Sequence, residues 1–430
     1  MTRRQKPGEL GRWRQSPSLS VAGFVGVALL SWVAVGSCTE PAQAPPALPS
    51  GGQPRPIDAI RAVIEALQAY PVVAIGESHN LKEAGAFYES LVAADAFSAS
   101  VDDIVVEFGN SLFQSTIDRY VSGKSVPRSE LKRVWQDTTQ VGAWDAPMYE
   151  AFFTAVRRAN AATPVVGIPG GGDAVRVLLG DPPIDWSRVH TKQQVHRYLV
   201  RREAFMAHII EDVLPKEHHA IVIAGLSHVE RSPTPTEHPN VTGMIDKTNP
   251  GAMYVVGLHL GFPKASWEQE LSTWTPPAIA ALQGTWIGGL PKGGGLAEDA
   301  LDAMLFLGLP DSLHLSIPLP NVYRDDGYWR ELHRRWRLDG MGHFSQASLF
   351  RSFSNAGYPG LFTQRGILQV EDLAMCIRAH GVEEFPAPQF QYDSVGFYGS
   401  AIQKAMNDPD FKSASATCHF SPGRPTDSGG

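Results

Sequence analysis

The feature that most limits the fold of this chain is an apolar run that ends in a titratable side chain, and it occurs three times. Residues 72–79 (VVAIGESH) and 220–228 (AIVIAGLSH) both pass through glycine to a histidine, and residues 103–107 (DIVVE) end in a glutamate. Unbroken apolar runs of this length are typical of strands buried on both faces of a parallel sheet. We therefore predict an α/β fold: a mainly parallel sheet with helices on both faces, plus helical or loop insertions and a C-terminal extension.

The titratable side chains at these strand ends are Glu77, His79, Glu107 and His228. In open α/β sheets, ligands bind beyond the carboxyl ends of the strands. We therefore expect these four side chains, which are far apart in the sequence, to meet in one pocket.

Other segments complete the expected architecture. Apolar spacing predicts helices over residues 80–94 and 191–214, and strands over residues 164–168, 253–258 and 303–308. Residues 111–161 are expected to be mostly helical, with breaks near Gly123 and Gly142, and the glycines at 170–172 to form a loop. Residues 263–295 are rich in Gly, Pro and Trp, which favours loops or a small insertion.

The bulk composition excludes one class of partner. The net charge is −7 and no basic face stands out, so nucleic-acid binding is not expected. Hydrophobic residues make up 43% of the chain, which is enough for a sizeable core.

The N-terminus is typical of an exported protein. A basic start is followed by an uncharged, largely apolar run over residues 18–35, and Gly36 and Ser37 precede Cys38. The apolar run is shorter than the ~20 residues of a spanning helix. This pattern resembles a bacterial lipoprotein signal, in which Cys38 carries the lipid and becomes the new N-terminus. A plain secretory signal and an uncleaved short anchor are the alternatives.

The chain divides into four predicted regions. Residues 1–37 are the signal peptide, 38–56 a Pro/Ala/Gly linker, 57–338 the α/β domain and 339–430 a C-terminal extension that ends in a disordered tail over 421–430. We expect the mature protein on the periplasmic or cell-surface face of a membrane, held by its lipid anchor. The oligomeric state does not follow from the sequence.

Three cysteines are present, and no zinc spacing connects them. If Cys38 is lipidated, Cys376 and Cys418 remain. They can pair in an oxidising compartment, but their sequence positions do not show whether they meet.

The order of motifs resembles the erythromycin-esterase/ChaN-like superfamily, which includes the Tiki metalloproteases. The matching segments are the GESH motif at 76–79, VVE at 105–107, the helical block containing Trp144 and residues 149–160, REAFMA at 202–207, GLSH at 225–228, and residues 302–308 before an Arg-rich helix. The resemblance covers roughly residues 57–338.

This resemblance implies a hydrolytic centre built from Glu and His. Its candidate catalytic residues are Glu77, His79, Glu107 and His228, with His79 as a general base toward water. The same four residues are candidate ligands for a divalent metal such as Zn, Mn or Fe. Arg202 is a candidate clamp for an anionic substrate group.

The resemblance also has departures and alternatives. Glu77 and His79 are separated by one residue, which is closer to the ChaN-like branch than to the esterases, so macrolide substrates are not expected. Trp144 is a candidate substrate contact but also a candidate core residue. Glu107 and Arg202 can instead form a structural ion pair, and His79 and His228 can make only local hydrogen bonds.

The functional expectation is an exported, lipid-anchored hydrolase, esterase-like or metal-dependent, acting on a small-molecule or peptide substrate. The alternative is a non-catalytic lipoprotein that binds haem or another ligand in the same cleft. A third option is a degenerate structural member of the fold. The sequence does not identify the substrate.

Overall fold

The computed structural model describes residues 48–162, 174–216, 218–232, 239–340, 364–393, 395–397 and 399–420. Several predicted features lie outside these residues. They are the signal peptide over 1–37, the lipidation site Cys38, the strand over 164–168, the glycine loop over 170–172 and the tail over 421–430. No helix in the described part of the chain is both long enough and apolar enough to span a membrane.

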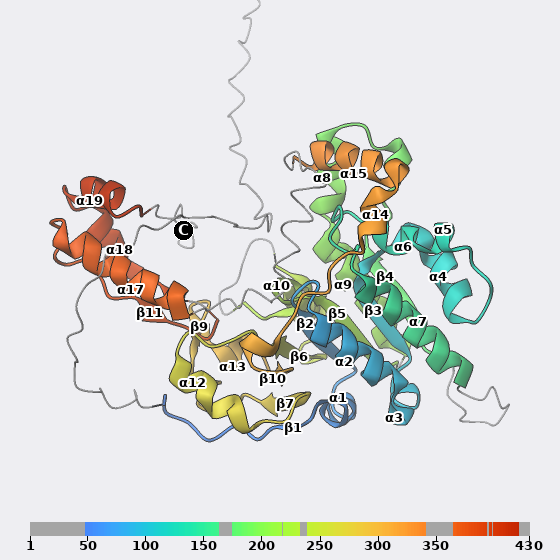
Figure 1. Cartoon of the computed structure of the whole chain (residues 1–430). Helices are drawn as coiled ribbons and strands as arrows, with labels where there is room; N and C mark the ends of the chain where they lie inside the picture. The colour runs from blue at the N-terminus through green and yellow to red at the C-terminus, as the bar shows by residue number, and fades with distance from the viewer. Residues whose placement is uncertain are drawn as a thin grey trace, which may run out of the picture. The chain divides into compact units, whose positions relative to one another are not determined.

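The fold is built on one eight-stranded sheet. Its strands are labelled in Figure 1. In spatial order its strands are β1 (Ile57–Asp58), β7 (Ala278–Ala281), β10 (Ala303–Phe306), β6 (Met253–Leu258), β2 (Val72–Glu77), β5 (Ala220–Gly225), β3 (Asp103–Asn110) and β4 (Arg176–Asp181). The strands from β10 to β4 are parallel, and β7 and β1 pair antiparallel at one edge. The predicted α/β fold with a mainly parallel sheet is confirmed.

The three motif strands lie side by side because they are apolar throughout. Every residue of β2, β5 and β3 is buried, and their Val and Ile side chains suit a pleated surface covered on both faces. Strand β2 pairs with β5 on one side and with β6 on the other. The chain leaves β2 for β3 on one side and later reaches β6 on the other, so β2 lies at a switch point of the sheet.

One face of the sheet is covered by helices from the N-terminal half of the chain. They are α1 (Ala59–Leu67), α2 (Lys82–Ala93), α3 (Asp95–Ser98), α4 (Gln114–Val121), α5 (Arg128–Leu131), α6 (Arg133–Gln136) and α7 (Pro147–Ala162). Helix α2 shows why: Ala84, Phe87, Tyr88 and Leu91 recur at helical spacing and are all buried.

Later helices cover the opposite face. They are α9 (Arg202–Val213), α10 (Leu226–Val229), α11 (Val241–Thr248), α12 (Ala265–Glu270) and α13 (Ala297–Ala300). A separate cluster joins α8 (Lys192–Leu199) to α14 (Pro320–Arg324) and α15 (Asp326–Asp339). Helices therefore lie on both faces of the sheet, as predicted.

The C-terminal region has a small core of its own. Its helices are α17 (Gln364–Ala379), α18 (Gly399–Met406) and α19 (Phe411–Thr417), and residues such as Ile377, Phe385 and Phe411 are buried among them. Two short ribbons complete the described structure: β8 (Pro291–Lys292) with β9 (Gly295–Leu296), and β11 (Gln389–Phe390) with β12 (Val395–Gly396).

Two local predictions are wrong. The single helix expected over 191–214 is two helices, because Val195 of α8 packs against α15 while Met206 and Ile210 of α9 pack on the sheet. The segment 263–295 is not only loops, since β7 adds a strand of small residues to the main sheet. The break between α8 and α9 carries no Gly or Pro signal. In the second segment, the Gly and Pro residues around β7 hide a strand of only four residues.

Candidate active site

The carboxyl ends of β2, β5 and β3 bring the predicted side chains together. Glu77 is the last residue of β2 and pairs in register with Gly225, the last residue of β5. Glu107 lies on the next strand, β3, and His228 lies on α10 directly after β5. The distances below show that the two acids and two imidazoles share one site.

Glu77 and His79 form an acid–imidazole pair. The carboxylate Oε1 of Glu77 lies 2.9 Å from Nδ1 of His79. The Glu77 side chain is fully buried, whereas a third of the His79 side chain is exposed. The pair thus has a buried carboxylate that orients an accessible imidazole, and a donating Nδ1–H leaves Nε2 as the free base.

Glu107 is held by several donors at once. It pairs with the guanidinium of Arg202, accepts from Nε2 of Gln140 at 2.5 Å and from the backbone N–H of Gly225 at 2.7 Å, and lies 3.1 Å from Nε2 of His228. The predicted alternative of a Glu107–Arg202 ion pair is therefore present in the same site.

Gly225 lies beside both His79 and Glu107. A Cβ at this position would lie 3.0 Å from Cε1 and 3.3 Å from Nε2 of His79, and 3.4 Å from Oε2 of Glu107. These contacts are tighter than side chains normally make, so the glycine leaves room for the imidazole. Nε2 of His79 faces the same space as the Glu107 carboxylate.

His228 lies between two carboxylates. Its Nδ1 is 2.5 Å from Oε1 of Glu203, and its Nε2 faces Glu107. Burial opposes the charged form, but the hydrogen bonds to Glu107 and Glu203 raise the pKa of His228 to about 9. At neutral pH this residue is an imidazolium that donates from both nitrogens.

The pKa values of Glu107, Glu77 and His79 also depend on one another. Burial opposes ionisation of Glu107, but the hydrogen bond from His228 and the charges of His228 and Arg202 hold its pKa well below the usual range. Burial raises the pKa of Glu77, and the hydrogen bond to His79 partly offsets this. Burial disfavours the imidazolium of His79, but Glu77 and the charge of Glu107 raise its pKa above the ordinary value.

Arg202 is the first residue of α9, and two carboxylates hold it. Besides Glu107, Asp181 lies 3.4 Å from its Nε. Asp181 ends β4, is buried, and accepts from the backbone N–H of Thr139 at 2.7 Å. Burial raises the pKa of Asp181 to about 6. The guanidinium predicted to clamp substrate thus already bridges two protein carboxylates.

Sequence reasoning missed three residues of this site: Asp181, Glu203 and Gln140. The signal for Asp181 was present, since residues 176–181 (RVLLGD) form another apolar run that ends in glycine and an acid. Glu203 follows Arg202 in the motif already noted, but its contact with His228 depends on how α9 packs. Gln140 lies between helices and carries no local pattern.

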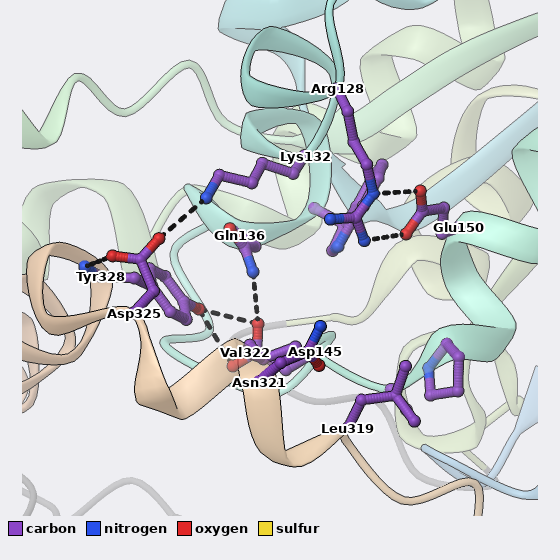
Figure 2. Close-up of a pocket in the computed structure, with 13 residues that line it drawn as sticks. Arg128, Lys132, Gln136, Asp145, Glu150, Leu319, Asn321, Val322, Asp325 and Tyr328 are labelled. Atoms are coloured by element: carbon purple, nitrogen blue, oxygen red, sulfur yellow. Dashed lines mark hydrogen bonds and ion pairs between the residues drawn. The ribbon is translucent and has the colours of Figure 1, made fainter.

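Trp144 is buried and lies edge-on against His79, with ring centroids 4.4 Å apart. It therefore positions the imidazole from the protein side. Its neighbour Asp145 accepts from the hydroxyl of Tyr328 at 2.8 Å in a cavity of about 100 Å³, which Figure 2 shows with Arg128 and Lys132 on its other side. Glu77, His79, Glu107 and His228 do not line this cavity.

The four predicted ligands do not fit a divalent metal. Glu107 already bonds to Arg202, His228 and the Gly225 N–H, and a guanidinium beside a carboxylate opposes a second cation there. Within the described ranges, Cys376, His380 and Cys418 form the only group of three His, Cys, Asp or Glu residues with ligand atoms close enough to share an ion.

Fold and site together define the class: an α/β protein with an acid–imidazole site at the carboxyl edge of its parallel strands. No protein-family model and no curated protein matches the chain. Three solved structures with a similar fold share 10–12% sequence identity with this chain.

The first is an erythromycin esterase mutant in its open conformation, at 10% identity and a TM-score of 0.39, covering 57% of this chain and 92% of that one. The second, a succinoglycan biosynthesis protein, has 12% identity and a TM-score of 0.42, covering 59% and 94%. The third, ChaN of Campylobacter jejuni with cofacially bound haem, has 12% identity and a TM-score of 0.30, covering 57% and 90%. These similarities assign no residue and no activity to this chain.

Proposed function

We propose that this chain is an exported, lipid-anchored hydrolase of the erythromycin-esterase/ChaN-like superfamily, in which Glu77 and His79 activate water. The observation that carries the proposal is the buried Glu77 carboxylate bonded to a His79 imidazole that is one-third exposed. A buried acid that fixes the tautomer of an accessible imidazole is the arrangement a general base requires. The proposed reaction uses no metal.

The proposed step is hydrolysis of a carboxylic ester or a related acyl compound. Nε2 of His79 takes a proton from water, the water oxygen bonds to the carbonyl carbon, and the carbonyl electron pair moves onto its oxygen. When this intermediate collapses, the bond to the leaving group breaks, and His79 returns the proton to the leaving oxygen.

In this proposal the charges of Glu107, His228 and Arg202 set the pKa of His79. Glu107 stays ionised because His228 and Arg202 are positively charged around it. Its negative charge raises the pKa of His79 and so strengthens the base. His228 is a positioning residue, since carboxylates engage both of its nitrogens.

A panel of aryl esters, lactones and peptide amides tests the proposal on the full chain. His79→Ala and Glu77→Gln should each lower kcat/KM at least 100-fold, the usual range for loss of a general base, with an unchanged circular dichroism spectrum. The rate should rise with pH through the pKa of His79, because only the neutral imidazole accepts a proton.

His314→Ala is the matched control. His314 also pairs with a carboxylate at 2.9 Å, that of Glu83, but it is exposed and belongs to no part of the proposed machinery. The kcat/KM of the His314→Ala variant should equal that of the parent chain. Turnover that survives both His79→Ala and Glu77→Gln would contradict the mechanism.

Haem binding is the second candidate function, and the partly exposed imidazole of His79 favours it. Haem iron accepts an axial histidine nitrogen. A titration followed by the haem absorption band should show saturable binding that His79→Ala abolishes. Turnover by the parent chain without such binding would favour the hydrolase.

A further inference from the structure

The C-terminal region holds a second group of chemically active side chains. Cys376 lies on α17, His380 follows the end of that helix, and Cys418 directly follows α19. The two cysteines form a disulfide with Cα atoms 5.9 Å apart. The ligand atoms of all three residues lie within 4.8 Å of one another.

Packing of the helices holds the two cysteines together independently of the covalent bond. Ile377, next to Cys376, and Ala414, four residues before Cys418, are both fully buried in the small C-terminal core. The rings of Phe385 and Phe411 stack in the same core. Because these contacts do not involve the sulfur atoms, we expect the core to hold the two cysteines close together after the disulfide is reduced.

His380 completes the group from one helical turn away. It follows Cys376 by four residues, the spacing that places two side chains on one face of a helix. Its Nδ1 lies 3.8 Å from the sulfur of Cys376 and 3.8 Å from that of Cys418. Nδ1 also donates to the carbonyl of Cys376 at 2.8 Å, so a metal bound at Nδ1 replaces this hydrogen bond, and the proton moves to Nε2 of the exposed ring.

These distances suit a tetrahedral metal site. Bonds of about 2.3 Å to sulfur and about 2.1 Å to nitrogen place the ligand atoms of such a site roughly 3.6 Å apart. The nitrogen–sulfur distances of 3.8 Å are already near this value. Two thiolates and an imidazole select zinc-class, thiophilic cations over magnesium or calcium.

We propose that Cys376, His380 and Cys418 form a redox-gated site for one zinc-class cation. A dithiol reductant supplies two electrons and two protons: the S–S bond breaks, two thiols form, and the reductant becomes a disulfide. The cation then displaces one proton from each thiol and bonds to both sulfurs and one imidazole nitrogen, leaving the fourth position to water. In the reverse direction a disulfide oxidant takes two electrons from the two thiolates and two protons from water. The Cys376–Cys418 bond re-forms, the oxidant becomes a dithiol, and the ion is released.

A cobalt titration tests the site, since Co(II) reports zinc-type coordination by its absorption. The full chain carries Cys38→Ser, so that only two thiols exist after reduction. A phosphine reduces the disulfide to two thiols and becomes a phosphine oxide, whose oxygen atom comes from water. The protein is then desalted under an oxygen-free atmosphere. The reduced chain should bind one Co(II), show thiolate charge-transfer and tetrahedral bands, and lose both on addition of Zn(II). The oxidised chain should show neither.

Two histidine variants separate the three-ligand site from a plain thiol pair. His380→Ala should weaken Co(II) binding at least tenfold and alter the tetrahedral bands. His419→Ala is the matched control, because this exposed imidazole adjoins Cys418 but lies outside the group, and it should bind like the parent.

Two results overturn the proposal. One is a reduced chain that shows no cobalt–thiolate absorption. This result counts against the site even if reduction partly unfolds the region, because metal binding and folding are coupled in zinc-type sites. The other is a His380→Ala variant with the parent's affinity and spectrum.

Discussion

His228 shows most clearly how single residues set the chemistry of this site. Its two ring nitrogens face Glu107 and Glu203, and its pKa of about 9 keeps it charged at neutral pH. In the unfolded chain the same imidazole has a pKa near 6.5. Folding therefore favours the protonated form of His228. Its contribution to the free energy of unfolding depends on pH.

We predict a stability difference that fades as pH rises. Because the folded pKa is raised, the contribution of His228 is fully present below about pH 6.5 and is lost as pH rises toward about 9. Urea unfolding of the parent and of His228→Gln should differ by an amount on the order of 2–3 kcal/mol near pH 6. That difference should shrink toward pH 9.

His314→Gln provides the comparison for this prediction, because its pair with Glu83 is exposed and such pairs contribute little. It should show no pH-dependent difference of this size. A His228→Gln difference that stays constant between pH 6 and pH 9 would mean that the imidazole is not charged by its neighbours.

Among the structural elements, β2, β5 and α10 position the site through their close approach. Gly76 on β2 faces α10, and a Cβ there would lie 2.5 Å from Cδ1 and 3.0 Å from Cα of Leu226. The second contact involves backbone, so a side-chain rotation cannot relieve it. Because Gly76 has no side chain, α10 can lie close to β2 and place His228 over the end of the strand.

Gly76→Ala should therefore move α10. We expect a loss of about 1–3 kcal/mol in the free energy of unfolding, as for other overpacked positions, and a large loss of turnover as His228 shifts. Gly289→Ala is the control, since the nearest contact of its Cβ would be an ordinary 3.4 Å. Equal melting temperatures and equal activities for the two variants would show that Gly76 does not set the position of α10.

The same elements show what the sequence could and could not predict. Parallel strands share one polarity, so apolar runs that end in Glu or His predict a common edge, and Glu77, Glu107 and His228 do lie close to His79 there. The side chains that surround this edge come from helices placed by long-range packing. Glu203 is an example, because its contact with His228 depends on how α9 packs against the sheet.

At the scale of the whole chain, the proposed anchor determines where the site works. We propose that residues 1–37 are a lipoprotein signal and that Cys38 carries the lipid, so Cys38→Ser should abolish lipid attachment. In a bacterial host, metabolic labelling with a fatty acid should mark the parent chain and leave the variant unlabelled. An equally labelled variant would rule out Cys38 as the lipidated residue.

The fold brings strand ends that are distant in the sequence into electrostatic contact. Glu107 raises the pKa of His79 although 28 positions separate them in the sequence. Histidine ring resonances followed by nuclear magnetic resonance against pH test this without a substrate. In Glu107→Gln the pKa of His79 should fall below its value in the parent chain. An unaltered His79 titration would show that the two side chains do not share a site.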